Sequence, residues 1–222
     1  MKKLFIVANL KSYETETEAK KWLEVFKNVK DLNEDLSQKE VIICPPFTLL
    51  ELFKDFFLKN DIKVSLGAQD LSPFDEGAYT GEINAKQIKD FAQYVLIGHS
   101  ERRKNFNETD NMLSDKVKLA LDYGLKPIYI IQNKDTEIPQ GIELVAYEPV
   151  LAIGTGEPDT PENADTISQK VLSKSIGYNI LYGGSVNSGN VNSFTIKNNI
   201  SGVLVGGASL DPEEFIQIIK NA

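Results

Sequence analysis

A carboxylate, an imidazole, an ammonium and an amide each follow a short apolar run in this 222-residue sequence. The four residues are Glu148, His99, Lys11 and Asn9. A base, an imidazole and an ammonium in one place could perform acid–base chemistry on a bound ligand. Each residue also has a simpler reading, because a lone charge at a strand end is usually solvated and a single histidine is often a satisfied core side chain. These four residues would indicate a functional site only if the fold brings them together in one place.

Eight such apolar runs recur along the chain. They cover residues 4–8, 41–44, 64–68, 94–97, 127–131, 144–147, 179–182 and 202–205. Short stretches of unbroken apolarity are typical of strands buried on both faces, as in a parallel sheet covered by helices. The runs therefore predict eight parallel strands.

Helix-start signals lie between most of the runs. Thr15 with Glu18 and Thr48 with Glu51 fit the capping box, in which each side chain satisfies a free backbone NH. In two further places a cap residue precedes a proline, at Thr160–Pro161 and Asp211–Pro212. Other helices are predicted over 84–92, about 109–123 and 190–197. Strands alternating with helices indicate either a βα-barrel or a doubly wound sheet.

One connection breaks the alternation. Residues 132–142 contain Pro139 and Gly141 and show no helical period, so a loop is expected where the fifth helix should be. With eight strands, the pattern favours a (β/α)8 barrel that lacks the helix between strands 5 and 6, built as one domain over residues 1–222. In such a barrel the residues at the carboxyl ends of the strands face one mouth. That end would gather the four polar residues and two glycine-rich turns, residues 182–185 and Gly206–Gly207.

Composition and charge narrow the functional classes. A formal net charge of −8 and a pI near 4.9 argue against broad nucleic-acid or anionic-membrane binding, since both need a basic surface. Cys44 is the single cysteine and His99 the single histidine, so neither a disulfide framework nor a structural zinc site is expected. No export signal or membrane span is recognised, and the cytoplasm is the expected compartment.

Longer strings of the sequence resemble the triosephosphate isomerase family, in the family's order and from the first strand to the last helix. They are ANLK at 8–11, GAQDLSPFDEGAYTGE at 67–82, IGHSERR at 97–103, AYEPVLAIGTG at 146–156, ILYGGSVN at 180–187 and GVLVGGASL at 202–210. Any one string is weak evidence, whereas six together are highly specific. The resemblance implies that dihydroxyacetone phosphate and glyceraldehyde 3-phosphate are interconverted through an enediolate, a step of glycolysis and gluconeogenesis that needs no cofactor and no metal.

Matching positions imply the catalytic roles. Glu148 corresponds to the general base and His99 to the electrophile, which in this family is a neutral imidazole whose pKa is lowered by a helix N-terminus, a well-known example of pKa tuning. Lys11 would supply a fixed positive charge and Asn9 an amide hydrogen bond to the substrate oxygens. General base catalysis typically contributes about 10²- to 10⁴-fold, so charge stabilisation must supply much of the rest.

The resemblance also implies how the phosphate is held. Backbone NH groups of Ser185, Gly206, Gly207 and Gly154 would bind the dianion, since glycine lets the main chain approach closely. Residues 149–155 resemble the family's closing lid, which would exclude water during the reaction.

Two ion pairs are expected to support the site. Glu101 would hold Lys11 in place, and Glu108 would pair with Arg102 in a structural role.

A homodimer is implied as well. The loop from Asp70 to Glu82 would insert into the neighbour, and Thr80 would reach the first-strand residues of the other subunit. Ser12 and Tyr13 depart from the family pattern at positions where that dimer forms, and Leu151 stands where the lid usually has tryptophan.

Two other classes of function are weighed against the isomerase. A barrel for aldol or decarboxylation chemistry would normally need a Schiff-base lysine or a metal. Lys126, however, lies at the start of the fifth run, away from the mouth. A catalytically inactive phosphate-binding protein would be expected to have lost Glu148, His99 or Lys11, and the sequence has all three.

Overall fold

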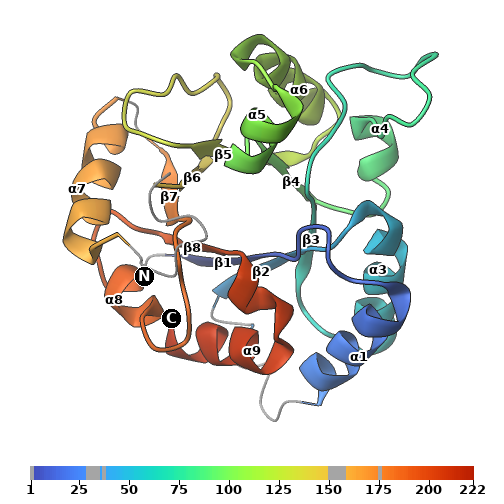
Figure 1. The fold of residues 1–222 in the computed structure, drawn as a ribbon, viewed down its shortest axis with the longest axis horizontal. Helices are drawn as coiled ribbons and strands as arrows, with labels where there is room; N and C mark the ends of the chain where they lie inside the picture. Colours follow the sequence, from blue (N-terminus) through green and yellow to red (C-terminus); the bar gives the residue numbers. More distant parts are fainter. Residues whose placement is uncertain (1–2, 29–35, 37–38, 150–158, 175–176) are drawn as a thin grey trace.

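Eight parallel strands close into a barrel in sequence order, with β8 paired to β1 (Figure 1). The structure is a computed structural model that describes residues 3–28, 36, 39–149, 159–174 and 177–222. The strands are β1 (Leu4–Asn9), β2 (Lys39–Cys44), β3 (Ser65–Ala68), β4 (Tyr94–Ile97), β5 (Lys126–Ile131), β6 (Leu144–Tyr147), β7 (Asn179–Tyr182) and β8 (Gly202–Val205). Every predicted run thus coincides with a strand to within two residues at each end, and the predicted (β/α)8 barrel is confirmed.

The strands are mostly apolar because both of their faces are buried. One buried cluster contains only strand residues, including Val7, Ile42 and Leu96, and fills the interior of the barrel. The intervening strand residues, such as Ile6 and Ile43, join a second cluster that includes the helices. Successive side chains of a strand point to opposite faces, so each strand contributes to both sides of the barrel wall.

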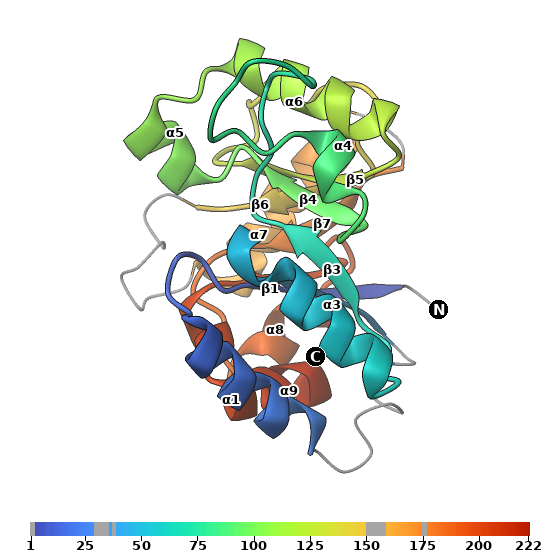
Figure 2. The ribbon, with the colours of Figure 1, turned by 90° about the vertical axis from the view of Figure 1, so that its right-hand side faces the viewer.

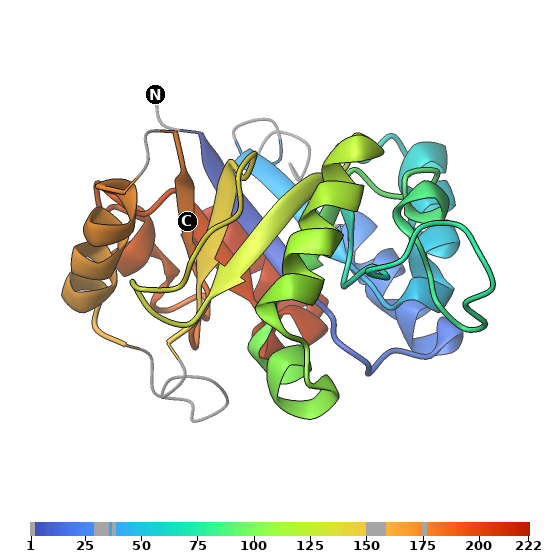
Figure 3. The same ribbon diagram turned by 90° about the horizontal axis from the view of Figure 1, so that it is seen from above.

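Helices surround the barrel (Figure 1), and Figure 3, turned by 90°, shows the strands slanting between helices on either side. They are α1 (Glu16–Lys27), α3 (Leu50–Lys59), α4 (Ala85–Ile88), α5 (Ser100–Phe106), α6 (Asp110–Asp122), α7 (Pro161–Leu172), α8 (Val191–Thr195) and α9 (Pro212–Asn221). Figure 2 shows α1, α3 and α9 together on one side of the barrel. Trp22 of α1 contacts Phe53 of α3 and Phe215 of α9, with ring centroids 5.8 and 6.3 Å apart. This aromatic cluster joins the first and last helices.

Most predicted helix starts are confirmed. Thr15 and Glu18 form the reciprocal capping box of α1. Thr160 accepts the backbone N–H of Asn163 at the start of α7, and Asp211 accepts two backbone N–H groups at the start of α9.

The capping box predicted at Thr48 and Glu51 is wrong. Residues Phe47–Leu49 form a 3-10 turn, η1, and α3 begins at Leu50 without a side-chain cap. This turn has a backbone hydrogen bond of its own, in which the Leu49 N–H donates to the Pro46 carbonyl at 2.9 Å. Thr48 therefore lies inside a turn instead of at the position before a helix.

Two connections matter for the site. Residues 132–143 between β5 and β6 contain turns and no helix, as predicted, and Figure 1 shows them as an open loop. In contrast, the short helix α5 directly after β4 was not predicted. Its signal is the charge pattern that favours a helix dipole, with Glu101 in the first turn and Arg103 and Lys104 in the last.

Candidate active site

The carboxyl ends of the strands enclose one cavity of about 440 Å³. Its lining includes all four residues predicted to be catalytic and three of those predicted to hold phosphate: Asn9, Lys11, His99, Glu148, Ser185, Gly206 and Gly207. Further lining residues, to which the sequence assigned no part in binding or catalysis, include Tyr13, Asn187, Leu204 and Leu210. The predicted convergence of the four polar strand-end side chains at one mouth is thus present in the structure.

Glu148 and His99 are in direct contact. Glu148 Oε1 lies 3.1 Å from His99 Nε2, and both side chains are almost fully buried. Glu148 follows β6 and accepts the backbone N–H of Ser100 on its other oxygen, at 3.3 Å. The first turn of α5 therefore orients the carboxylate, a contact that no local sequence signal indicates.

The same turn also orients the imidazole. The backbone N–H of Glu101 donates to His99 Nδ1 at 3.2 Å, so in the neutral ring the proton is on Nε2, the nitrogen that faces Glu148. Burial of the ring lowers the pKa of His99, but the hydrogen bond and charge of Glu148, with the charge of Glu101, outweigh it. In this arrangement the pKa lies above the usual value for histidine, opposite to the lowered pKa that the family resemblance implies, because Glu148 contacts the ring directly.

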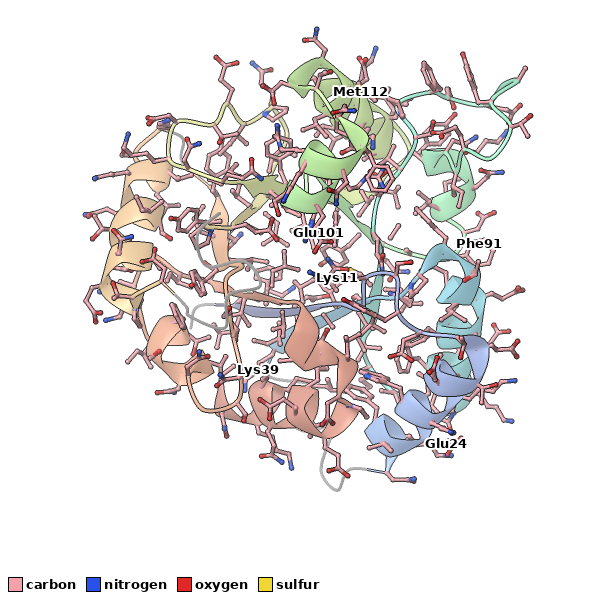
Figure 4. All side chains as sticks on the ribbon, viewed as in Figure 1. Lys11, Glu24, Lys39, Phe91, Glu101 and Met112 are labelled. Carbon is pink, nitrogen blue, oxygen red and sulfur yellow. The ribbon has the colours of Figure 1, made fainter. Side chains whose placement is uncertain are left out.

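Lys11 is held from several sides. Its ammonium lies 2.5 Å from Glu101 Oε1, the ion pair expected from the sequence. Figure 4 shows the two residues close to the middle of the barrel. The backbone of Lys11 has a φ of +53°, which is uncommon for a residue other than glycine. Asn9 Oδ1 accepts the Lys11 N–H at 3.1 Å, and the Gln69 amide donates to the Lys11 carbonyl at 2.8 Å. These bonds hold the strained turn that aims the ammonium into the cavity.

Glycines leave room for the charged side chains. A Cβ added to Gly183 would lie 2.9 Å from Glu148 Cγ, and one added to Gly206 would lie 3.3 Å from Lys11 Cε. A real Cβ almost never approaches another atom as closely as the first of these distances. The glycine-rich turns after β7 and β8 therefore allow Glu148 and Lys11 to occupy their positions, whatever else their backbone binds.

Gly154 and most of the predicted lid, residues 150–155, lie outside the described residues. On one side of this segment Pro149 is buried directly after Glu148. On the other side the backbone N–H of Asp159 donates to the Tyr182 hydroxyl at 2.8 Å. Tyr182 itself is fixed by stacking on Phe194, with ring centroids 4.0 Å apart.

Thr80 and Lys126 lie away from the cavity. Thr80 is exposed on the long connection between β3 and α4, which extends outward at the upper right of Figure 1. Lys126 begins β5 at the opposite end of the barrel, with its ammonium 5.3 Å from the centroid of the Tyr94 ring. Lys126 therefore cannot act as a Schiff-base lysine in this cavity.

A buried network of four charges supports α5. The predicted pair of Arg102 and Glu108 is present, with 2.6 Å between Arg102 Nε and Glu108 Oε1. Lys116 of α6, almost fully buried, contacts the carboxylates of both Glu108 and Asp70, and Asp70 also contacts Arg102. Burial raises the pKa of Asp70, and the charge of Glu108 adds to that rise against the attraction of Lys116 and Arg102. The two carboxylates thus depend on the two cations.

Replacing Lys116 with methionine is expected to lower the free energy of unfolding by about 3 kcal/mol, because two buried carboxylates would lose their shared cation. Urea unfolding of the variant and the parent protein would measure this. Lys118→Met is the matched control, since Lys118 is exposed on the same helix. Equal losses in the two variants would contradict the structural role of the network.

The fold and the cavity define the class of protein. It is a (β/α)8 barrel with a carboxylate, an imidazole and an ammonium gathered at the carboxyl ends of its strands, the end at which barrel enzymes carry their active sites. Among the described residues, no group of three or more His, Cys, Asp or Glu side chains is arranged to bind a metal, and no helix could span a membrane.

A family model for triosephosphate isomerase matches residues 4–222, and the chain belongs to that family. Its relatives include the triosephosphate isomerases of Dictyoglomus thermophilum, 39% identical over an alignment 254 positions long, and of Thermus thermophilus, 36% identical over 255 positions. Both alignments cover 100% of this chain and of the relative. The triosephosphate isomerase of Trichodesmium erythraeum is 37% identical, with 99% of each chain covered.

Proposed function

We propose that this chain is an isomerase that interconverts dihydroxyacetone phosphate and D-glyceraldehyde 3-phosphate by proton transfer through an enediolate. The observation that carries the proposal is the gathering of Glu148, His99 and Lys11 around one cavity whose far wall is two glycine-rich turns. Family membership and the names of the relatives support it. A coupled assay that starts from glyceraldehyde 3-phosphate tests it, and an inactive wild-type protein would refute it.

Substrate binding must separate Glu148 from His99. Their side chains are 3.1 Å apart, which leaves no space for the substrate atoms that the base and the electrophile have to reach. The carboxylate therefore moves away from the imidazole when substrate enters, and the Ser100 N–H bond at 3.3 Å is released or rearranged. In its new position Glu148 removes a proton from the carbon beside the carbonyl and returns it to the neighbouring carbon.

The neutral imidazole donates its Nε2–H to the substrate oxygen. Glu148 becomes uncharged when it takes the substrate proton, and the main interaction that raises the pKa of His99 is then lost. Burial of the ring and the charge of Lys11 remain, and both lower that pKa. The Glu101 N–H bond to Nδ1 also disfavours a second proton on the ring.

Lys11 and Asn9 complete the stabilisation of the oxygens. The ammonium is a fixed positive charge in a site that excludes most water, where charge stabilisation is worth far more than in bulk solvent. The Glu101 carboxylate lies 2.5 Å from the Lys11 ammonium and restricts its movement.

Backbone NH groups of Ser185, Gly206 and Gly207 bind the phosphate. All three residues line the cavity on the side of β7 and β8, and Gly206 lies next to the Lys11 side chain. Gly154 would add a further NH from the lid. The bond between Tyr182 and Asp159 supports this lid, because it fixes the chain directly after the segment.

A homodimer of single-domain subunits, residues 1–222, is part of the proposal. The loop from Asp70 to Glu82 carries Phe74 and Tyr79, which stack on each other with centroids 4.4 Å apart although both are about half exposed. Tyr13, at the edge of the cavity, is 67% exposed. Aromatic side chains are enriched at protein interfaces, so these three exposed rings support a dimer contact. Thr80 would reach the first-strand residues of the other subunit.

Sedimentation at micromolar concentration is expected to give the mass of a dimer, about twice 24.7 kDa. Thr80→Arg should shift the protein toward the monomer, because a charge would be buried where the loop inserts. Lys86→Arg, on the helix that follows the loop, is the control and should leave the dimer intact. A monomeric wild-type protein would refute this part of the proposal.

The chemistry places the enzyme in glycolysis and gluconeogenesis, and we propose the cytoplasm as its location. No cofactor takes part, because the proton transfer needs only the carboxylate, the imidazole and the ammonium. Nucleic acid and membranes are not expected partners, given the acidic net charge of −8.

A further inference from the structure

The turn after β7, residues 183–190, is built by two asparagines. Asn187 Oδ1 accepts the backbone N–H groups of Gly189 and Asn190, at 2.9 and 3.1 Å, and Asn190 Oδ1 accepts the Asn187 N–H at 2.9 Å. The Asn190 amide then donates to the Ser185 carbonyl at 3.0 Å. These bonds connect Ser185, on the cavity wall, to Ser188 at the outer end of the turn through one small, internally bonded unit.

Helix α9 holds this unit from outside. Glu214 Oε1 accepts the Ser188 N–H at 2.7 Å, and Glu214 Oε2 accepts the Ser188 hydroxyl at 2.9 Å. Asn221, at the far end of the same helix, donates to the Ser188 carbonyl at 2.9 Å. Ser188 is thus bound through its backbone and its side chain by two residues of one helix, and the pair of bonds to a charged carboxylate is the stronger part.

Helix α9 also begins directly after the other glycine turn. Residues Gly207–Leu210 form η3, and Asp211 then caps α9 by accepting the N–H groups of Glu213 and Glu214, at 2.9 and 3.3 Å. Figure 1 shows α9 following β8 and lying between α8 and α1, and it contacts both helices. The first turn of α9 is therefore connected to both glycine turns. It follows the turn after β8 in the chain, and its Glu214 side chain binds the turn after β7.

We propose that Glu214 is a positioning residue that fixes the spacing between the two glycine turns, so that the NH groups of Ser185 and of Gly206–Gly207 bind the same phosphate. Glu214 is not among the residues that line the cavity, so its role would be exerted through the turn that it holds. The inference rests on the proposed function, since it concerns the phosphate of that substrate. It adds a residue from outside the cavity to the set that determines phosphate affinity.

The sign of the effect distinguishes positioning from electrostatics. Glu214 is an acidic residue near a site for a dianion, so its charge alone weakens phosphate binding, and removing that charge should tighten binding slightly. If Glu214 instead holds the turn in place, its removal weakens binding despite the lost repulsion. Neighbouring Glu213 is exposed in the same helical turn and supplies a matched charge without the contact to Ser188.

Glu214→Ala is expected to raise the KM for glyceraldehyde 3-phosphate and the Kd for inorganic phosphate, each by about tenfold, because a charge-assisted pair of hydrogen bonds is lost. The kcat should stay within about twofold of the wild-type value, since the catalytic residues are held by other contacts. Glu213→Ala should leave both constants unchanged or slightly lower. Glu214→Gln, which can still accept the Ser188 N–H and donate to its hydroxyl oxygen, should restore most of the affinity.

Ser188→Ala provides a milder variant in case Glu214→Ala folds poorly. It removes the hydroxyl bond alone, and should raise the phosphate Kd by about threefold. Combined with Glu214→Ala it should add no further weakening, because both changes break the same contact.

Direct binding of inorganic phosphate by calorimetry separates this inference from the proposed function. A wild-type protein without isomerase activity would refute the function, whereas weaker phosphate binding by Glu214→Ala alone would still support the positioning role. If Glu214→Ala and Ser188→Ala bind phosphate as tightly as Glu213→Ala, the inference is overturned.

Discussion

Replacing Glu148 with glutamine is expected to lower kcat by about 10³-fold or more, because the amide cannot accept a proton from carbon. The change keeps the size of the side chain, and its amide oxygen can still accept the Ser100 N–H, so the structure of the site should persist. The KM should change much less than kcat, since Glu148 acts on the reacting carbon and does not bind the phosphate. The coupled assay from glyceraldehyde 3-phosphate measures both constants.

Glu143→Gln is the control for this experiment. Glu143 lies directly before β6, at the end of the strand opposite to Glu148, and is exposed. The Glu143→Gln variant should retain the wild-type kcat. A Glu148→Gln variant that keeps more than about a tenth of the wild-type kcat would remove this carboxylate as the base.

Reaction in D2O gives a second readout of the same step. A single carboxylate that carries the proton between two carbons can exchange it with solvent, so product formed by the wild-type enzyme should contain deuterium at the receiving carbon. The Glu148→Gln variant should incorporate deuterium no faster than it turns over. Deuterium incorporation at the wild-type rate in the variant would point to a different base.

The strands could be predicted closely because their physical signal is local. Each strand of a covered parallel barrel is buried on both faces, so it appears in the sequence as a short unbroken apolar run. Runs such as 94–97 and 144–147 match β4 and β6 residue for residue. Helix starts at Thr15 and Asp211 were equally local, since a cap involves only residues a few positions apart.

The errors and omissions have a different cause. The capping pattern at Thr48 fits a helix start, but the preceding prolines and the 3-10 turn move the start to Leu50. The short helix α5 contains no buried residue, so it has no apolar period to reveal it. In both cases the surrounding structure decided a conformation that the local sequence left open.

The residues of the candidate site could be predicted from the sequence, but the contacts that orient them could not. Strand ends in a barrel meet at one mouth, which brings Lys11, His99 and Glu148 together for topological reasons alone. Their orientation, however, depends on contacts between residues far apart in the chain, such as Gln69 with the Lys11 carbonyl and Lys116 with Asp70. No spacing rule connects such pairs.

The first turn of α5 supports all three of the groups that are proposed to be catalytic. Its backbone N–H groups bind the Glu148 carboxylate and the His99 ring, and its Glu101 side chain holds the Lys11 ammonium. Arg102, in the same turn, anchors the helix in the buried charge network with Asp70 and Glu108. Helix α5 was not predicted from the sequence, yet it holds the three side chains, Glu148, His99 and Lys11, that were.

Lys11→Met is expected to lower kcat/KM by about 10³-fold, because in the proposed mechanism the ammonium stabilises the developing oxyanion and attracts the phosphate. Lys11 is the lysine that lines the described cavity. Methionine fills a similar volume beside Gly206 without any charge. Both constants should worsen, because the same charge acts on the bound substrate and on the transition state. Steady-state kinetics at several ionic strengths measure this.

The loss has two parts that a second variant separates. Without the Lys11 ammonium, the carboxylate of Glu101 loses the cation it contacts and would repel the dianionic substrate. Lys11→Met combined with Glu101→Gln removes that repulsion, so it should recover part of the affinity and none of the transition-state stabilisation. Lys21→Met, an equal loss of charge at an exposed position of α1, is the control and should behave as wild type. In a chain with a net charge of −8, attraction of a dianion has to come from groups at the site, and Lys11 is the lysine that lines the described cavity. A Lys11→Met variant within about tenfold of wild type would therefore contradict the proposed site as a whole.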